Sequence, residues 1–350
     1  MIKVWTDKND LENIKWSYSD YFYYYFGLQV KDSLDFFNIE KINISENKYF
    51  ELVEDINEAD IIIPLHSATV LYKNFKNTFD KYIDLSKKHN KTILLNLMGD
   101  FPIKIDIKNS IELKNSIYRY EYKKNEIAVP ALIEDLGDKR FLIQDKKESP
   151  SIGFVGFADY PNLKSKLKVL LQVVYTYLFQ RDKVSQIRGI YFRKRILNSL
   201  QKSKLITQNF LIRKYYSGIK KDVEHFDKLR EEYINNLKSS DYILCIKGDG
   251  NYSLRFYETL SMGKIPILVD TDKVLPLEDV IDYKKFCIII NVKDINNIDK
   301  IVYDFHSNLT NEEFKNIQQL ARTTYEKYLN MSDFYKVLFN NIGKKDRKEI

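Results

Sequence analysis

The 350-residue chain contains few of the residues that build disulfide scaffolds or zinc sites. Cysteine occurs only twice and histidine four times, and neither a pair of CxxC motifs nor an HExxH motif is present. Disulfide frameworks and zinc sites need several such residues at short, fixed spacings. We therefore expect Cys245 and Cys287, each inside an apolar run, to be buried reduced thiols, and we expect no metal and no cofactor in the chemistry.

Long apolar runs are absent as well. No segment approaches the about 20 apolar residues that cross a bilayer, and the first residues, MIKVWTDKNDLENIKW, are too polar for a secretory signal. These absences predict a cytoplasmic protein. The formal net charge of +7 permits attraction to phosphates, nucleotides, anionic membranes or nucleic acids without selecting among them. Peripheral contact with the inner face of a membrane through basic surface is a further expectation.

Short apolar segments alternate with longer amphipathic ones along most of the chain. Segments of strand length cover residues 2–6, 59–67, 91–99, 151–159, 241–250, 264–271 and 285–294. Near-continuous apolar strands separated by helical patterns are typical of parallel sheets covered on both faces. The sequence therefore predicts the α/β class, with two Rossmann-like domains facing across a cleft.

The alternation pauses between residues 120 and 150, where two prolines and a charged stretch occur. We place the domain boundary late in this segment, so that residues 1–145 form the first domain and residues 146–319 the second. Residues 311–342 predict a long C-terminal helix, continuous or broken. The segment from about 320 to 350 is expected to pack back towards the first domain and to count with it.

The stretch at 247–271, KGDGNYSLRFYETLSMGKIPILVDT, lies between a predicted strand and a predicted helix. Gly248 and Gly250 allow main-chain amides to approach a ligand. Ser253 is a candidate N-cap, and Gly263 follows the last helical turn, where a C′ glycine belongs. A helix N-terminus presents free N–H groups and a positive dipole end. This arrangement favours a phosphate group.

Two charged residues in the predicted helix leave two interpretations open. The forked guanidinium of Arg255 matches phosphate oxygens. Glu258 can accept hydrogen bonds from ribose hydroxyls, or it can form an ordinary ion pair with Arg255 one turn away. The stretch is therefore either an anion site or a turn followed by a helix with an ion pair. Neither GxxxxGK[ST] nor GxGxxG is present.

The same stretch resembles the exostosin-like glycosyltransferases in the order and spacing of its residues over 241–290. Weaker similarity extends to residues 188–200 and 120–136. The matching features are Cys245, the GDGNYS loop, Ser253-x-Arg255-x-x-Glu258, Gly263-x-x-Pro266, and the segment from Asp270 to VLPLEDVIDYKKF (274–286).

The resemblance implies an inverting enzyme of the GT-B type. It implies a sugar nucleotide, usually a UDP-sugar, in the second domain and a glycan or glycolipid acceptor mainly in the first, as in polysaccharide biosynthesis. By the same match, Ser253 and Arg255 face the diphosphate and Glu258 faces the ribose. The expected donor-binding residues are Lys247, Gly248, Asp249, Gly250, Asn251, Tyr252, Ser253, Arg255 and Glu258, joined by Arg193 and Arg213.

A sugar transfer that uses no metal needs positively charged protein groups beside the leaving diphosphate, because the diphosphate gains negative charge. An inverting transfer also needs one general base near the acceptor hydroxyl. Our candidates for the base are Asp135, Asp100 and His66, and further carboxylates at strand ends or in the hinge are Asp20, Glu134 and Asp159. His66 follows the apolar IIIPL and titrates near neutrality.

Two other functions remain open at this point. The segment 181–221 holds twelve Lys or Arg residues and one acid, so a nucleic-acid-binding protein is one alternative. A protein that binds a sugar nucleotide without catalysis is the other. If the protein is a glycosyltransferase, we expect it to have no nucleic-acid partner. Steep salt dependence of binding to single-stranded nucleic acid would instead indicate the first alternative.

Overall fold

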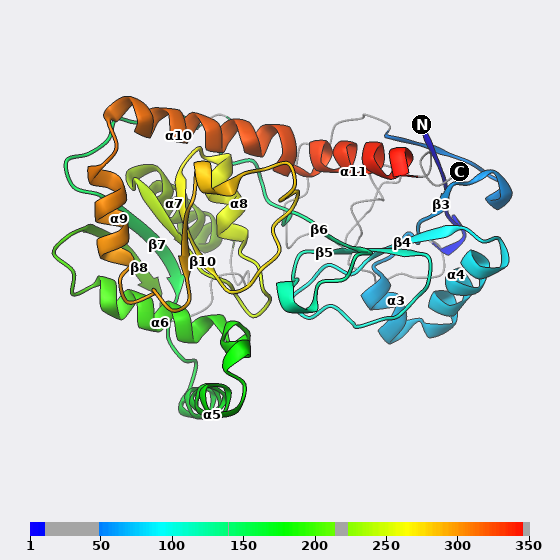
Figure 1. The fold of residues 1–350 in the computed structure, drawn as a ribbon, viewed down its shortest axis with the longest axis horizontal. Coiled ribbons are helices and arrows are strands. Elements are labelled where there is room, and N and C mark those ends of the chain that lie inside the picture. Colours follow the sequence, from blue (N-terminus) through cyan, green and yellow to red (C-terminus); the bar gives the residue numbers. More distant parts are fainter. Residues whose placement is uncertain (11–48, 139, 214–222, 346–350) are drawn as a thin grey trace. The chain divides into compact units, whose positions relative to one another are not determined.

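The structure is a computed structural model, and it describes residues 1–10, 49–138, 140–213 and 223–345 (Figure 1). The chain forms two compact units. Unit 1 comprises Met1–Glu134, Val274–Leu277 and Lys327–Ile350, and unit 2 comprises Asp135–Lys273 and Glu278–Glu326.

Unit 1 is built on a six-stranded parallel sheet with the order β2-β1-β3-β4-β5-β6. In this order the chain first moves to one side of β1 and then returns to the other, so the direction of the connections reverses between β1 and β3. The strands are β1 (Ile2–Trp5), β2 (Phe50–Leu52), β3 (Ile61–Ile62), β4 (Thr92–Asn96), β5 (Ser110–Lys114) and β6 (Glu126–Ala128).

Helices supply apolar side chains to two core clusters of this sheet. One cluster joins it to α3 (Ala68–Asn74) and α4 (Lys76–Lys88). The other joins it to α11 (Met331–Lys345), whose Phe339 ring lies 5.1 Å from the ring of Phe50. The C-terminal helix therefore packs with the first sheet, as expected. Strands buried on both faces explain the near-continuous apolar runs of the sequence.

Unit 2 contains a five-stranded parallel sheet with the order β11-β10-β9-β7-β8. Numbered within the unit, this is the doubly wound order 2-1-3-4-5, and the connections reverse direction between β7 and β9. The strands are β7 (Ser151–Phe157), β8 (Thr207–Arg213), β9 (Tyr242–Cys245), β10 (Ile265–Asp270) and β11 (Ile288–Asn291). The helices are α5 (Leu163–Phe179), α6 (Gly189–Leu200), α7 (Val223–Ser239), α8 (Leu254–Ser261), α9 (Ile298–Ser307) and α10 (Asn311–Thr324).

The α/β class and its parallel sheets are confirmed, and four strands were not predicted. Among these, β8 is an edge strand with mostly exposed side chains inside the basic segment, so it lacks an apolar run. The predicted C-terminal helix is broken by a π-helical turn, Tyr325–Leu329, and the two units divide within this turn. Among the described residues, no helix is both long and apolar enough to cross a membrane.

The units divide after Glu134, earlier in the chain than the boundary expected after residue 145. Hydrogen bonds explain this position, because the intervening segment is held by α10. The amide of Gln144 donates to Gln318 Oε1 (3.1 Å), and the amide of Lys146 donates to Asn311 Oδ1 (2.7 Å). Residues 135–145 therefore belong to the second compact body.

Candidate functional site

The loop after β9 leaves the sheet of unit 2 beside the point where the strand order reverses. In open α/β sheets, ligands bind outside the carboxyl ends of the strands at this point. The loop is closed by a hydrogen bond from the Gly248 amide to the Tyr252 carbonyl (3.3 Å). Asn251 is buried and fixed to the end of β10, because its Oδ1 accepts from Thr271 Oγ1 (2.6 Å).

The helix that follows begins and ends as predicted. Ser253 is the N-cap of α8 with an extended backbone, and within the described structure its side chain makes no capping hydrogen bond. Met262 is the C-cap, so Gly263 occupies C′, with the positive φ of 63° that glycine accepts readily. The amides of the first turn and the Ser253 hydroxyl therefore lie at the carboxyl end of the sheet.

The start of α6 lies directly against this loop. A Cβ on Gly189 would lie 2.2 Å from the Lys247 carbonyl oxygen and 2.4 Å from that of Gly248, so only glycine permits the contact. The preceding residue, Arg188, donates to Asp249 Oδ1 at 2.9 Å. The basic segment thus contributes a helix N-terminus and a guanidinium to the surroundings of the loop.

Two buried lysines stand at this end of the sheet. Lys247 is fully buried and its Nζ donates to the Ser185 carbonyl (2.6 Å). Its pKa is lowered to about 7, chiefly by burial and also by the charge of Lys273, against the opposing effect of Asp249. Burial likewise lowers the pKa of Lys273 to about 8. Both side chains would gain from a nearby anion, which favours the charged form.

Two arginines lie across the same strand ends. Arg193 of α6 donates to the Phe157 carbonyl at the end of β7 (3.4 Å), and its Nη2 would lie 3.8 Å from a Cβ on Gly248. Arg255 donates to the carbonyls of Leu244 on β9 and Val155 on β7, with its guanidinium over the Phe154 ring. The structure therefore shows Arg255 bridging the two strands, and its role toward a diphosphate stays a prediction.

Glu258 is held by α7 rather than by Arg255. Its carboxylate accepts from Arg230 Nη1 (2.8 Å) and from the Tyr233 hydroxyl (2.5 Å). Arg213 also faces α7, donating to the Leu229 carbonyl (2.9 Å) and pairing with Glu232 (3.2 Å). The ordinary Arg255–Glu258 pair considered from the sequence is absent from the described structure. The predicted contact of Glu258 with a ribose stays untested.

The candidates for the general base are divided between the two units. His66 follows β3 and Asp100 follows β4, so both lie at the carboxyl edge of the unit 1 sheet. His66 is buried, with Nε2 at 3.2 Å from the Asp10 carbonyl oxygen. Burial lowers the pKa of His66, and the neighbouring Asp10 opposes this effect. The ring therefore lies at the point where the order of this sheet reverses.

Asp135 lies in unit 2, where both of its carboxylate oxygens accept from Arg322, one of them at 3.0 Å. The Gly137 amide also donates to it (3.0 Å). A base in this position would have to give up an ion pair. Of the further candidates, Asp159 pairs with Lys194, and Asp20 lies outside the described residues.

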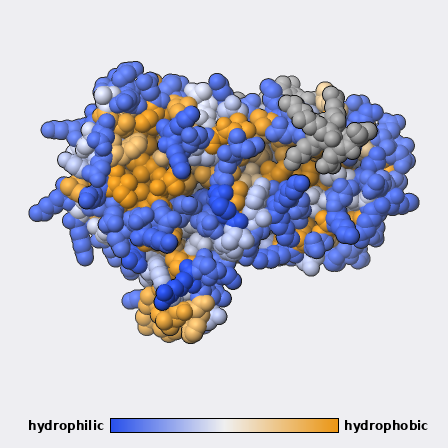
Figure 2. All heavy atoms as spheres, viewed as in Figure 1, coloured by the Kyte–Doolittle hydropathy of each residue, from blue (hydrophilic) through white to orange (hydrophobic). Residues whose placement is uncertain are grey.

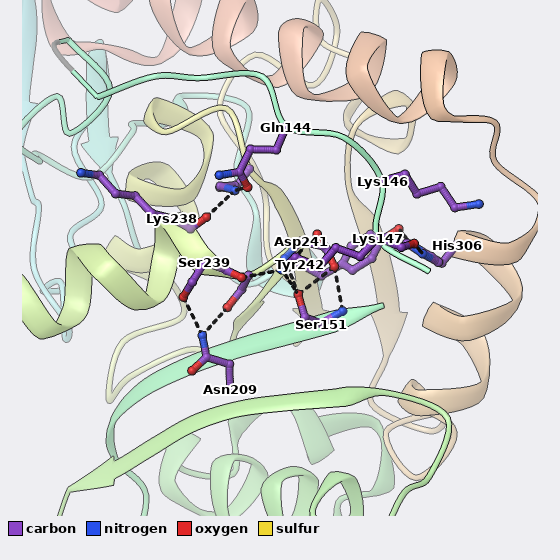
Figure 3. A network of polar contacts seen from close by, with 12 residues as sticks. Gln144, Lys146, Lys147, Ser151, Asn209, Lys238, Ser239, Asp241, Tyr242 and His306 are labelled. Carbon is purple, nitrogen blue, oxygen red and sulfur yellow. Dashed lines mark hydrogen bonds and ion pairs between the residues drawn. The ribbon is translucent and has the colours of Figure 1, made fainter. Parts of the chain in front are cut away.

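The opposite end of the unit 2 sheet carries a polar network of a different kind (Figure 3). The buried Asp241 accepts from the amide and the hydroxyl of Ser151 (2.9 and 2.7 Å) and lies 3.6 Å from Lys147 Nζ. His306 joins the network between the Tyr242 hydroxyl (2.9 Å) and the Lys147 carbonyl (2.8 Å). These contacts tie the segment before β7 to the sheet.

Within the ranges that the structure describes, no set of three or more His, Cys, Asp or Glu side chains is arranged to hold a metal ion.

The part of the chain that forms the contacts around the β9 loop is similar to known proteins. Residues 181–305 match the model of the exostosin GT47 domain. This segment is similar to the exostosin GT47 family. It contains the β9 loop, α6, α8 and both buried lysines, so the resemblance inferred from residues 241–290 is confirmed.

Curated relatives match part of the chain. It is 28% identical over 109 residues to the exostosin-1 homolog of Caenorhabditis elegans, covering 31% of this chain and 27% of that protein. A probable glycosyltransferase of Arabidopsis thaliana is 25% identical over 104 residues, 29% of this chain and 22% of that protein. The chain thus covers about a quarter of the length of these relatives.

Among solved structures, a glycosyltransferase from Rickettsia africae aligns over 100% of this chain and 99% of its own, with 14% identity and a TM-score of 0.43.

Sequence reasoning missed Lys273, Arg188 and the pair Arg230–Tyr233. Lys273 comes three residues after the β10 strand, and only the pairing of β10 with β9 brings it near Lys247. Arg188 precedes the glycine that opens α6, inside the segment of weaker resemblance at 188–200. A search for cations immediately after strand ends would have found the first of these residues.

Proposed function

We propose that the protein is a glycosyltransferase that moves a sugar from a nucleotide sugar, in particular a UDP-sugar, to a glycan or glycolipid acceptor. The observation that supports this most is the pair of buried lysines, Lys247 and Lys273, within the exostosin domain and beside a glycine loop at the carboxyl ends of the strands. An anionic group of a ligand beside two buried cations would favour their charged forms.

The proposed transfer inverts the configuration and uses no metal. The acceptor oxygen bonds to the anomeric carbon as the bond from that carbon to the diphosphate oxygen breaks, and the acceptor proton passes to a base. Negative charge then grows on the diphosphate, where Lys247, Lys273 and the first-turn amides of α8 would stabilise it. Arg193 would add a guanidinium on the side of α6.

His66 is the base candidate that we favour for this step. Its lowered pKa keeps the imidazole neutral at pH 7, so that it can accept a proton. Asp135, by comparison, is already engaged by Arg322. We expect His66→Gln to lose at least about a hundredfold in turnover while UDP affinity stays within about twofold. Asp135→Asn serves as the comparison, and a reversed pattern would move the assignment to Asp135.

A donor panel tests the proposed function directly. UDP-, GDP- and CMP-sugars are incubated with the full chain, with and without EDTA, and both binding and release of the free nucleotide are measured. One nucleotide class should bind, and its sugar should be released or transferred with EDTA present. Binding without turnover in any acceptor extract would leave a sugar-nucleotide-binding protein. Salt-sensitive binding of single-stranded nucleic acid, with no nucleotide bound, would overturn both.

A further inference from the structure

Helix α5 is an addition to the fold that the sheet does not require. Strands β7 and β8 are neighbours and run parallel, and one crossover helix is enough to join such a pair. α6 can serve as this crossover, and α5 is inserted before it (Figure 1). In the view of Figure 1, α5 lies beyond α6, away from the sheet.

The helix contacts the rest of unit 2 along one narrow stripe. Val169 and Thr176 are its buried residues, and Val173 packs against the main core. Gln172 Nε2 donates to the Gln186 carbonyl at 3.4 Å. These positions lie within about a third of the circumference, at 100° per residue. Tyr177, which contacts Tyr191, lies next to this stripe, and the opposite side of the helix faces outward.

That outward surface is apolar. The first residue of α5 and the exposed side chains at offsets of 4, 7, 8, 11, 12 and 15 from it form one continuous helical face. They are Leu163, Leu167, Leu170, Leu171, Val174, Tyr175 and Leu178, with exposed fractions from 40% to 78%, and Phe179 at the helix end is 72% exposed. Figure 2 shows apolar side chains gathered on this helix, below the blue surface of the unit. A contiguous exposed patch of this kind marks an interaction site.

Lysines border the apolar face on both sides. Lys168 lies on one side of it and Lys166 on the other, Lys164 projects within the margin on the Lys168 side, and the helix contains no Asp or Glu. An apolar face between lysines, with aromatic residues at one end, is the pattern of a helix that lies in a membrane interface. Anionic headgroups would complement these charges. A second copy of α5 would instead bring like charges together, which disfavours self-association.

We propose that α5 is an interfacial helix that docks the protein onto an anionic lipid surface. The helix lies flat, with Leu167, Leu171 and Leu178 inserted among the acyl chains and the lysines at the headgroups. Its 17 residues span about 25 Å. The proposal depends on the exposure and charge of α5 alone, and it holds whatever reaction the domain catalyses.

Vesicle flotation with the full-length protein tests the proposal. Vesicles of phosphatidylcholine are compared with vesicles that also contain about 30 mol% phosphatidylglycerol. The wild type should bind the anionic vesicles and bind the neutral ones weakly. Leu167→Ser, Leu171→Ser and Leu178→Ser combined should weaken binding to anionic vesicles at least about tenfold, since affinity follows the buried apolar area. Melting curves should match the wild type, because all three side chains are more than half exposed.

A charge-matched pair of variants isolates the lysines. Replacing Lys164, Lys166 and Lys168 by Gln should weaken binding to anionic vesicles by about fivefold per lysine, on the order of a hundredfold in total at low salt. The control replaces three exposed lysines elsewhere in unit 2, Lys284, Lys285 and Lys293, by Gln. It removes the same net charge and should bind as the wild type does. If both variants lose the same affinity for anionic vesicles, overall charge alone accounts for binding, and the proposed docking site is overturned.

A fluorescent label reports insertion directly. Leu171→Cys can be labelled with an environment-sensitive dye because Cys245 and Cys287 are buried. Anionic vesicles should shift its emission to the blue, and the same label on Lys284→Cys should not respond. The proposal is overturned if the wild type ignores anionic vesicles or if the leucine variant still binds them fully. A dimer that the leucine variant converts to monomer, without vesicle binding, would show that a second copy covers α5.

Discussion

The buried lysines predict that nucleotide affinity falls steeply as the pH rises above neutrality. The pKa of Lys247 is about 7 and that of Lys273 is about 8, because both ammonium groups are buried. A diphosphate beside them stabilises the charged forms and raises both pKa values. Well below pH 7 the lysines are already charged, so this factor no longer weakens affinity. Above pH 7 the free protein must take up protons in order to bind.

The size of this effect follows from the two pKa values. We take the pKa of each lysine to exceed 9 once the nucleotide is bound. Each lysine then weakens binding by the factor 1 + 10^(pH − pKa), where the pKa is that of the lysine in the protein without ligand. From pH 7 to 8 the combined loss is about tenfold, and from pH 8 to 9 it is about fiftyfold, so that the total is about 500-fold. The terminal phosphate of a nucleoside diphosphate titrates near pH 6 and adds little above pH 7.

The same burial predicts an opposite effect on stability. Between pH 7 and 10.5 the folded protein binds fewer protons at Lys247 than the unfolded chain, so this lysine makes the free energy of unfolding rise with pH. Its penalty is complete below pH 7 and disappears above 10.5, and it is on the order of 5 kcal/mol. Lys247→Met should therefore raise stability at pH 7 by a few kcal/mol and abolish UDP binding.

Calorimetry checks this prediction at constant ionic strength. UDP is titrated into the protein between pH 7 and 9, in two buffers with different enthalpies of ionisation, so that proton uptake is measured separately. Lys264→Met provides the matched control, because Lys264 is also buried, with a pKa lowered to about 8, but precedes β10 at the other end of the sheet. This variant should keep the steep profile. A flat dissociation constant over this range, without proton uptake, would refute the assignment.

Three further perturbations test separate parts of the structure. Gly189→Ala places a methyl group 2.2 Å from the Lys247 carbonyl and should weaken UDP binding at least about tenfold, measured by the same calorimetry. Lys114→Met leaves the buried carboxylates of Glu112 and Glu126 without the ammonium that joins them at 2.5 and 2.6 Å, and should cost about 3–5 kcal/mol in urea unfolding. Arg322→Ala removes the partner of Asp135 and should lower the free energy of unfolding by about 2–4 kcal/mol in the same assay. An unchanged urea midpoint in the Lys114 or the Arg322 variant would contradict the argument that these ion pairs stabilise the fold.

Local signals in the sequence predicted local structure well. The N-cap at Ser253 and the C′ glycine at 263 depend on adjacent residues, and both have the predicted positions. The apolar runs of buried strands were equally clear. β8 was missed because an edge strand with exposed side chains lacks this pattern. β6 was missed because it holds three residues within a segment of irregular composition.

The surroundings of the site depended on contacts that sequence spacing does not encode. Arg255 bonds to the carbonyl of Val155, 100 residues earlier in the chain, because β7 and β9 are adjacent. Glu258 finds its cation on α7 rather than one turn away. Residue types at 247–258 left an anion site and an ordinary turn both open, whereas the order 2-1-3-4-5 decides which side chains stand around the loop. The periodicity of apolar residues in the sequence does not reveal this strand order.

The electrostatics of unit 2 independently favour the carboxyl end of its sheet as the ligand site. At the amino end, the strongest charge acting on the buried Lys264 is the carboxylate of Asp241, which also receives two hydrogen bonds from Ser151. At the carboxyl end, the strongest charge acting on the buried Lys247 is another lysine, Lys273, and the carboxylates of Asp249 and Asp270 act in the opposite direction on Lys247 and Lys273 respectively. An anionic ligand at this end would add to the effect of these carboxylates and favour the charged forms of both lysines. Its binding free energy would then stabilise the folded protein.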